Sequence, residues 1–93
     1  MRKKPTIFPL AIRDIQNGID YYRQQQKGLG KKFESEVHGA IKKIEKHPSS
    51  ASFAYSDVRY HVLDKFPYII LYQYDDMGLY ILRIFNTHQI PQY

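Results

Sequence analysis

The sequence predicts an α+β protein with the element order β-α-α-β-β-β, in which a helical hairpin packs on one face of a small, mainly antiparallel sheet. Two observations support this order. In the first half apolar residues recur every three to four positions, as in helices, and in the second half they alternate, as in strands. Glycine and proline stand between these segments. The 93 residues suffice for one domain, residues 1–93, without an internal repeat.

The first three elements are a short strand and two helices. Residues 4–8 read as the strand, which Pro9 ends. The first helix begins near Leu10, where Asp14 suits the positive end of the helix dipole. Gly28 and Gly30 end this helix and turn the chain. We expect its core-facing stripe to consist of Ile12, Ile15, Ile19 and Tyr22.

The second helix is predicted over residues 31–47, and Pro48 stops it. So short a link between two helices predicts an antiparallel hairpin. One face of this helix is apolar and the other is basic. The apolar positions are Phe33, Val37, Ala40, Ile41 and Ile44, and the lysines that we expect to contact a target or a nucleic acid are Lys31, Lys32, Lys42, Lys43 and Lys46.

The second half reads as a loop over residues 48–57 and three strands over 58–63, 66–75 and 79–87. A hairpin turn of sequence DDMG joins the last two strands.

Alternation assigns the side chains of these strands to two faces. The larger, more aromatic set of the middle strand is predicted to face the helices: Phe66, Tyr68, Ile70, Tyr72 and Tyr74. The opposite face then carries Ile69, Leu71, Ile81 and Phe85, with Arg83 among them. The two helices cover only one face, so we expect this apolar set to bind a partner. The alternative is that the terminal segments of the chain cover it.

Composition and charge narrow the class of protein. There is no cysteine, which excludes a disulfide framework. The apolar stretch near the N-terminus is broken by Pro5 and Pro9, so we predict neither a signal peptide nor a membrane span, and we expect a cytoplasmic protein. The net charge of +5 suggests an acidic partner. Residues 1–47 hold 11 Lys and Arg against 5 Asp and Glu, whereas residues 48–93 hold 3 against 4.

Few residues have the spacing of a catalytic or metal site. His38 and His47 lie on the polar side of a helix without a second ligand, and no glycine-rich phosphate loop follows a strand, so we expect neither a metal nor a cofactor. The candidate for catalysis is a basic and phenolic cluster near the sheet that suits phosphodiester chemistry, formed by Arg59, His61, Arg83, His88 and Tyr93. The alternatives are an ion pair of Arg59 with Asp57 or Asp64, and an unordered chain end at Tyr93.

Taken in order, these signals resemble the RelE/ParE superfamily of bacterial type II toxins, in the branch called plasmid stabilisation proteins. The resemblance spans nearly the whole chain. Its first half rests on Pro9-Leu10-Ala11, Asp14-Ile15, Tyr21-Tyr22, Gly28-Leu29-Gly30 with Phe33, Val37, Ile41, Ile44 and Pro48. Its second half rests on Asp57-Val58-Arg59, Lys65-Phe66-Pro67-Tyr68 with Ile70 and Tyr72, and Pro91.

The resemblance implies a toxin that a cognate antitoxin neutralises in a toxin–antitoxin hetero-oligomer. It implies one of two targets, DNA gyrase for ParE-like members or messenger RNA on the ribosome for RelE-like endoribonucleases. Many relatives end in H-x-x-R-x-P, and alignment on Pro91 places Asn86 and Gln89 at the histidine and arginine positions. This departure favours the gyrase-binding hypothesis. The alternatives are a ribonuclease that uses Arg59, Arg83, His88 and Tyr93, and a non-toxic remnant that only binds antitoxin.

Overall fold

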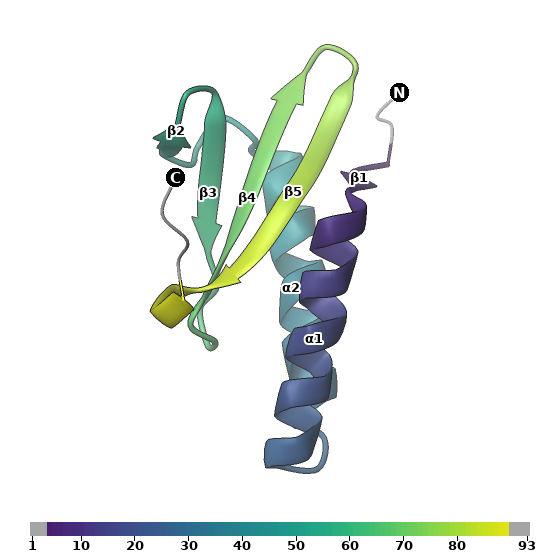
Figure 1. Cartoon of the computed structure of the whole chain (residues 1–93). Helices are drawn as coiled ribbons and strands as arrows, with labels where there is room; N and C mark the ends of the chain where they lie inside the picture. The colour runs from purple at the N-terminus through teal and green to yellow at the C-terminus, as the bar shows by residue number, and fades with distance from the viewer. Residues whose placement is uncertain (1–3, 90–93) are drawn as a thin grey trace.

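The computed structural model describes residues 4–89 and contains two helices beside a five-stranded sheet (Figure 1). The helices are α1 (Pro9–Gln25) and α2 (Leu29–Lys46). The strands are β1 (Thr6–Ile7), β2 (Phe53–Tyr55), β3 (Val58–Val62), β4 (Tyr68–Asp75) and β5 (Gly78–Asn86), and a 3-10 turn, η1 (Thr87–Gln89), follows. The predicted α+β class and helical hairpin are confirmed, and the predicted loop over 48–57 also contains the short strand β2.

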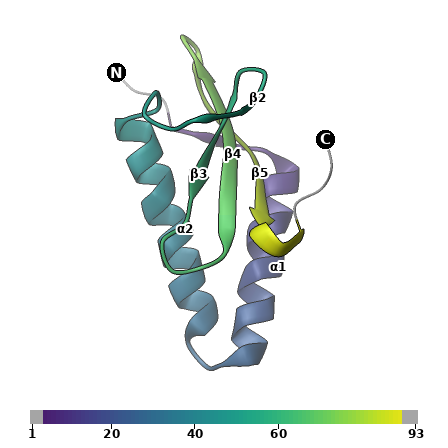
Figure 2. The same cartoon turned by 90° about the vertical axis from the view of Figure 1, so that its left-hand side faces the viewer.

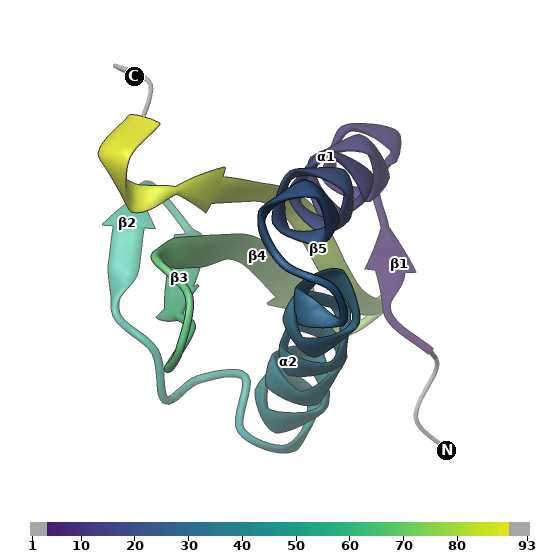
Figure 3. The ribbon, with the colours of Figure 1, turned by 90° about the horizontal axis from the view of Figure 1, so that it is seen from below.

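The two helices lie side by side, with β3, β4 and β5 crossing in front of them (Figure 2). Seen from below, the hairpin connection and both helices stand on one side of the sheet (Figure 3). Gly28 has a φ of 83°, a left-handed conformation that glycine adopts without steric cost. A Cβ on Gly18 would lie 2.4 Å from a ring carbon of Phe33, so glycine at this position is what allows α1 and α2 to approach closely.

The main core lies between the helices and the sheet. Tyr22 of α1 and Phe33 of α2 meet Phe66 and Tyr68, with ring centroids between 4.8 and 6.1 Å apart. Burial and the neighbouring Tyr68 raise the pKa of Tyr22 to about 12. The predicted stripe of α1 is partly wrong, because the side chain of Ile12 is 55% exposed while Ala11 and Gly18 are buried. Ile15, Ile19 and Tyr22 pack against the core as expected.

The sheet has the order β1-β5-β4-β3-β2, and only β1 pairs parallel with its neighbour. Strand β1 pairs only with Tyr80 and Ile81, so the outer edge of β5 has no strand neighbour beyond these residues in the described part of the chain. Leu71 of β4 pairs with Arg83 of β5, but the next residue, Tyr72, pairs with Ile81. Leu82 is therefore the additional residue of a β-bulge.

This bulge corrects the predicted faces of β5. Ile81 was expected on the face away from the helices, but it is fully buried in the main core on the helix side. Leu82 lies instead on the far side with Phe85, because one additional residue reverses the alternation along the strand. The far-side assignment of Ile69, Leu71 and Phe85 agrees with the structure.

Candidate functional site

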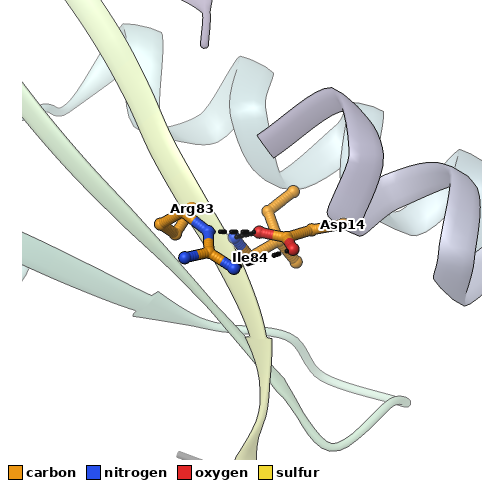
Figure 4. Close-up of polar contacts among 3 residues, drawn as sticks. All are labelled: Asp14, Arg83 and Ile84. Atoms are coloured by element: carbon orange, nitrogen blue, oxygen red, sulfur yellow. Dashed lines mark hydrogen bonds and ion pairs between the residues drawn. The ribbon is translucent and has the colours of Figure 1, made fainter. Parts of the chain in front are cut away.

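An ion pair joins α1 to the outer edge of β5 (Figure 4). Arg83 donates from Nε to Oδ2 of Asp14 at 2.8 Å and from Nη2 to Oδ1 at 3.1 Å. The backbone N–H of Ile84 donates to the same Oδ2 at 2.9 Å. The hydrogen bonds from Arg83 to Asp14 raise the pKa of the guanidinium further. Asp14 thus satisfies an edge N–H that no strand pairs, and it holds Arg83 in a fixed orientation.

A groove of about 660 Å³ lies beside this ion pair, between α1 and the end of β5. Its α1 wall consists of Asp14, Asn17, Gly18 and Tyr21. The rest of the lining is Tyr68 of β4, residues 83–86 of β5 and His88 of η1. Two of the sequence-predicted catalytic residues, Arg83 and His88, therefore line the same groove.

Arg59 belongs to a different part of the sheet. Its Nη1 donates to the carbonyl oxygens of Ser49 and Ala51, at 3.1 and 2.6 Å, and its guanidinium carbon lies 4.0 Å from the ring centroid of Phe53. Arg59 thus fastens the segment between α2 and β2 to the sheet. The predicted ion pairs of Arg59 with Asp57 or Asp64 are not formed among the described residues.

The structure does not bring the five candidate catalytic residues together. Cross-strand partners project from the same face of a sheet. Arg59 pairs with Tyr72, which lies in the helix-side core, and Arg83 pairs with Leu71, which lies on the far side. The two arginines therefore leave opposite faces, and Tyr93 lies outside the described residues.

His61 contributes to a third environment, against α2. Its imidazole lines a small cavity of about 110 Å³ with Lys43 and Asp64. Burial, and then the positive charge of Lys43, lower the pKa of His61. The adjoining loop is attached to α2 because the N–H of Lys65 donates to Glu36 at 2.9 Å and Lys43 lies 3.7 Å from Asp64.

The face of the sheet away from the helices carries a second apolar cluster. Ile69 and Leu71, which were expected to contact a partner, are only 9% and 1% exposed. They are covered by neighbours of the same face, which are Ala54, Tyr60, Leu82 and Phe85. The accessible apolar part of this face, here called the far-face patch, therefore consists of the half-buried Tyr60, Leu82 and Phe85, together with Val62, which is 53% exposed.

The five lysines of α2 form a stripe that faces away from the core. At about 100° per residue their positions fall within an arc of about 120°. The buried positions of α2 lie on the opposite side of the helix. The stripe runs from Lys31 to Lys46, roughly 23 Å at 1.5 Å per residue. All five side chains are exposed, and only Lys43 has a carboxylate within 4 Å among the described residues.

Some features of the groove were not anticipated from the sequence. Asp14 was interpreted only as a helix-dipole residue, and Asn17 was not considered. The one available signal was the placement of Asp14, Asn17 and Tyr21 at spacings of three and four, on one side of a helix. That spacing does not show which strand edge the helix meets, since Asp14 and Arg83 lie 69 positions apart.

The described part of the chain contains neither a candidate metal site nor a helix suited to cross a membrane. Within residues 4–89, no three His, Asp or Glu side chains are grouped so that they could hold a metal ion. Neither α1 nor α2 combines the length and the apolar composition that crossing a membrane requires.

Comparison with known proteins identifies the family. Residues 7–91 match the family model described as the ParE toxin of the type II toxin–antitoxin system parDE. A solved structure from P. aeruginosa, described as a chromosomal ParDE TA system, superposes with a TM-score of 0.73 at 16% sequence identity, over 89% of this chain and 94% of that one. No curated protein sequence matches the chain. Because the family match covers most of the chain, the protein belongs to the ParE toxin family of type II toxin–antitoxin systems.

Proposed function

We propose that this chain inhibits bacterial growth by binding DNA gyrase in the cytoplasm, and that a cognate antitoxin neutralises it in a hetero-oligomer. The observation that carries the proposal is the match of residues 7–91 to the ParE toxin family. The geometry of the arginines supports a binding mechanism over messenger cleavage. Arg59 and Arg83 leave opposite faces of the sheet and are each engaged by structural partners.

The lysine stripe of α2 is the proposed contact surface for the target. Its five ammonium groups are exposed on one helix face, and charges arranged in this way accelerate association with an acidic partner. Lys42 and Lys46 make no hydrogen bond or ion pair among the described residues, so we expect variants at these positions to keep the fold.

A supercoiling assay tests the target. Purified chain at micromolar concentration should prevent gyrase from supercoiling relaxed plasmid. The double variant Lys42→Glu, Lys46→Glu should inhibit much less. The matched control is Arg13→Glu, Lys27→Glu, which makes the same change of net charge outside the stripe and should inhibit like the parent chain. Unchanged supercoiling, with messenger cleaved on ribosomes instead, would exclude the gyrase proposal in favour of ribonuclease activity.

The far-face patch is the proposed docking surface for the antitoxin. It is apolar and accessible, and it lies on the face that the helices leave uncovered. Val62→Asp places a charge on this patch at a position that is 53% exposed, so the chain should fold and remain toxic. Co-expressed antitoxin should then fail to restore growth. Full neutralisation of Val62→Asp would show that the antitoxin binds elsewhere.

A further inference from the structure

The groove between α1 and β5 is assigned no ligand by the proposed binding of gyrase and antitoxin, and it shares only Phe85 with the far-face patch. Its two walls come from helix and strand residues far apart in sequence, which are Asn17 and Tyr21 on one side and Phe85, Asn86 and His88 on the other. Its volume of about 660 Å³ falls within the roughly 300–1,000 Å³ that is usual for small-molecule sites.

Flat surfaces for stacking line the groove on both walls. Tyr21 is 54% exposed, although one edge of its contacts is the ring of Tyr22, whose centroid lies 5.1 Å away. On the strand wall, the guanidinium carbon of Arg83 lies 4.5 Å from the ring centroid of Phe85. Aromatic rings and guanidinium planes are the two side-chain types on which unpaired nucleobases stack.

Hydrogen-bonding groups beside these surfaces are free. Within residues 4–89, neither the amide of Asn17 nor the imidazole of His88 has a hydrogen-bond partner. Asn86 uses its Oδ1 to accept from the backbone N–H of His88, which leaves its NH₂ group to donate. A side-chain amide offers a donor and an acceptor side by side, the pattern that also forms the edge of a nucleobase.

The charge of the groove argues against an anion as the recognised group. The carboxylate of Asp14 is offset by Arg83 and by the Ile84 N–H, so the two charged side chains of the lining form a closed pair. A ligand recognised mainly through phosphate would meet this carboxylate without an unpaired cation to compensate it. A neutral, flat ring with polar edges fits the lining better.

We propose that this groove binds a nucleobase, presented either by a free nucleotide or by single-stranded nucleic acid. The base stacks on Tyr21 or on the Arg83–Phe85 pair, and its edge exchanges hydrogen bonds with Asn17, Asn86 and His88. This site shares no residue with the lysine stripe and only Phe85 with the far-face patch, and Asn17 and Tyr21 lie outside both, so variants at these two positions test it independently of gyrase binding.

Titration of the full chain, followed by NMR, tests the proposal. The probes are the four nucleoside monophosphates, ribose 5-phosphate, a single-stranded pentanucleotide and a DNA duplex. Saturable shifts of the Asn17 and Tyr21 signals should appear with nucleotides and be absent with ribose 5-phosphate. Tighter binding of the pentanucleotide than of monophosphates identifies a strand as the source of the base, and equal binding identifies the free nucleotide.

Variants make the test specific to the groove. Tyr21→Ala should weaken binding roughly tenfold, the usual consequence of losing one stacking surface. Asn17→Ala should weaken binding of some bases more than others, while Tyr74→Ala, an exposed tyrosine outside the groove, should have no effect. Both groove positions are exposed, so the folds should survive, which circular dichroism checks. The proposal is overturned by the absence of saturable binding, by binding that ignores Tyr21→Ala and Asn17→Ala, or by equal affinity for the duplex.

Discussion

The ion pair between Asp14 and Arg83 is the interaction whose energetic role the structure defines most sharply. Asp14 accepts three hydrogen bonds, two from the guanidinium and one from the N–H of Ile84. The side chain of Asp14 is 14% exposed and that of Arg83 is 35% exposed. The substitutions Asp14→Ala and Arg83→Ala therefore remove different parts of one network.

The magnitudes follow from these contacts. Hydrogen bonds to charged groups contribute about 1.5–3 kcal/mol, but solvent screening at the partly exposed Arg83 reduces the pair to about 1 kcal/mol. In Asp14→Ala the N–H of Ile84 also loses its acceptor, which adds about 1 kcal/mol or slightly more to the destabilisation. Asp14→Ala should thus lower the free energy of unfolding by about 2–2.5 kcal/mol and the Tm by roughly 10–20 °C. Arg83→Ala should cost about 1 kcal/mol, since Asp14 still accepts from Ile84.

A double-mutant cycle measures the pair directly. Urea unfolding of the parent chain, both single variants and the double variant should give a coupling free energy of about 1 kcal/mol, because the second substitution removes a partner that is already missing. Additive losses, with coupling below about 0.3 kcal/mol, would refute the structural role of the pair.

Three further predictions concern the core and the sheet edge. Gly18→Ala should destabilise the chain by about 1–3 kcal/mol, because the new methyl group would clash with Phe33. In the control Gly39→Ala the methyl group has no atom within 4 Å, and this variant should stabilise α2 by about 0.5–1 kcal/mol. Equal Tm values for the two variants would contradict this account. The pKa of His61 is lowered in the folded chain, so folding favours the neutral imidazole. The free energy of unfolding should therefore keep the contribution of His61 above pH 6.5 and lose it as the pH falls through the folded pKa. In His61→Gln, the free energy of unfolding from denaturation curves should fall less between pH 7 and 5. Arg59→Met should speed amide hydrogen exchange in residues 49–55, and unchanged exchange there would show that the two carbonyl hydrogen bonds do not hold this segment.

Much of the fold follows from local sequence patterns. The apolar face of α2 was predicted residue by residue, since Phe33, Val37, Ala40, Ile41 and Ile44 are all buried. The turn at Gly28 was equally readable, because few residues other than glycine adopt a positive φ there. The spacing of apolar residues in helices and strands depends only on residues near one another in the sequence, so it can be recognised without the tertiary structure.

The candidate site was predicted less completely, for a different physical reason. Arg83 and His88 were singled out and both line the groove, but Arg59 was grouped with them and lies elsewhere. Asn17 and Tyr21 could be assigned to the groove only from the packing of α1 against β5. Which helix face meets which strand edge depends on packing between segments about 70 residues apart, and no local pattern contains that information.

The amino-acid sequence by itself determined the helical hairpin, the antiparallel strands and the likeness to a toxin family. The tertiary structure alone decided which side chains of β5 are buried. One additional residue, Leu82, in the pairing of β5 with β4 moves Ile81 into the core and leaves Leu82 on the far side. Side chains alternate with a period of two, so a single bulge reverses the face of every earlier position in the strand. The bulge depends on the register in which β5 pairs with β4, and this register cannot be read from the sequence of one strand.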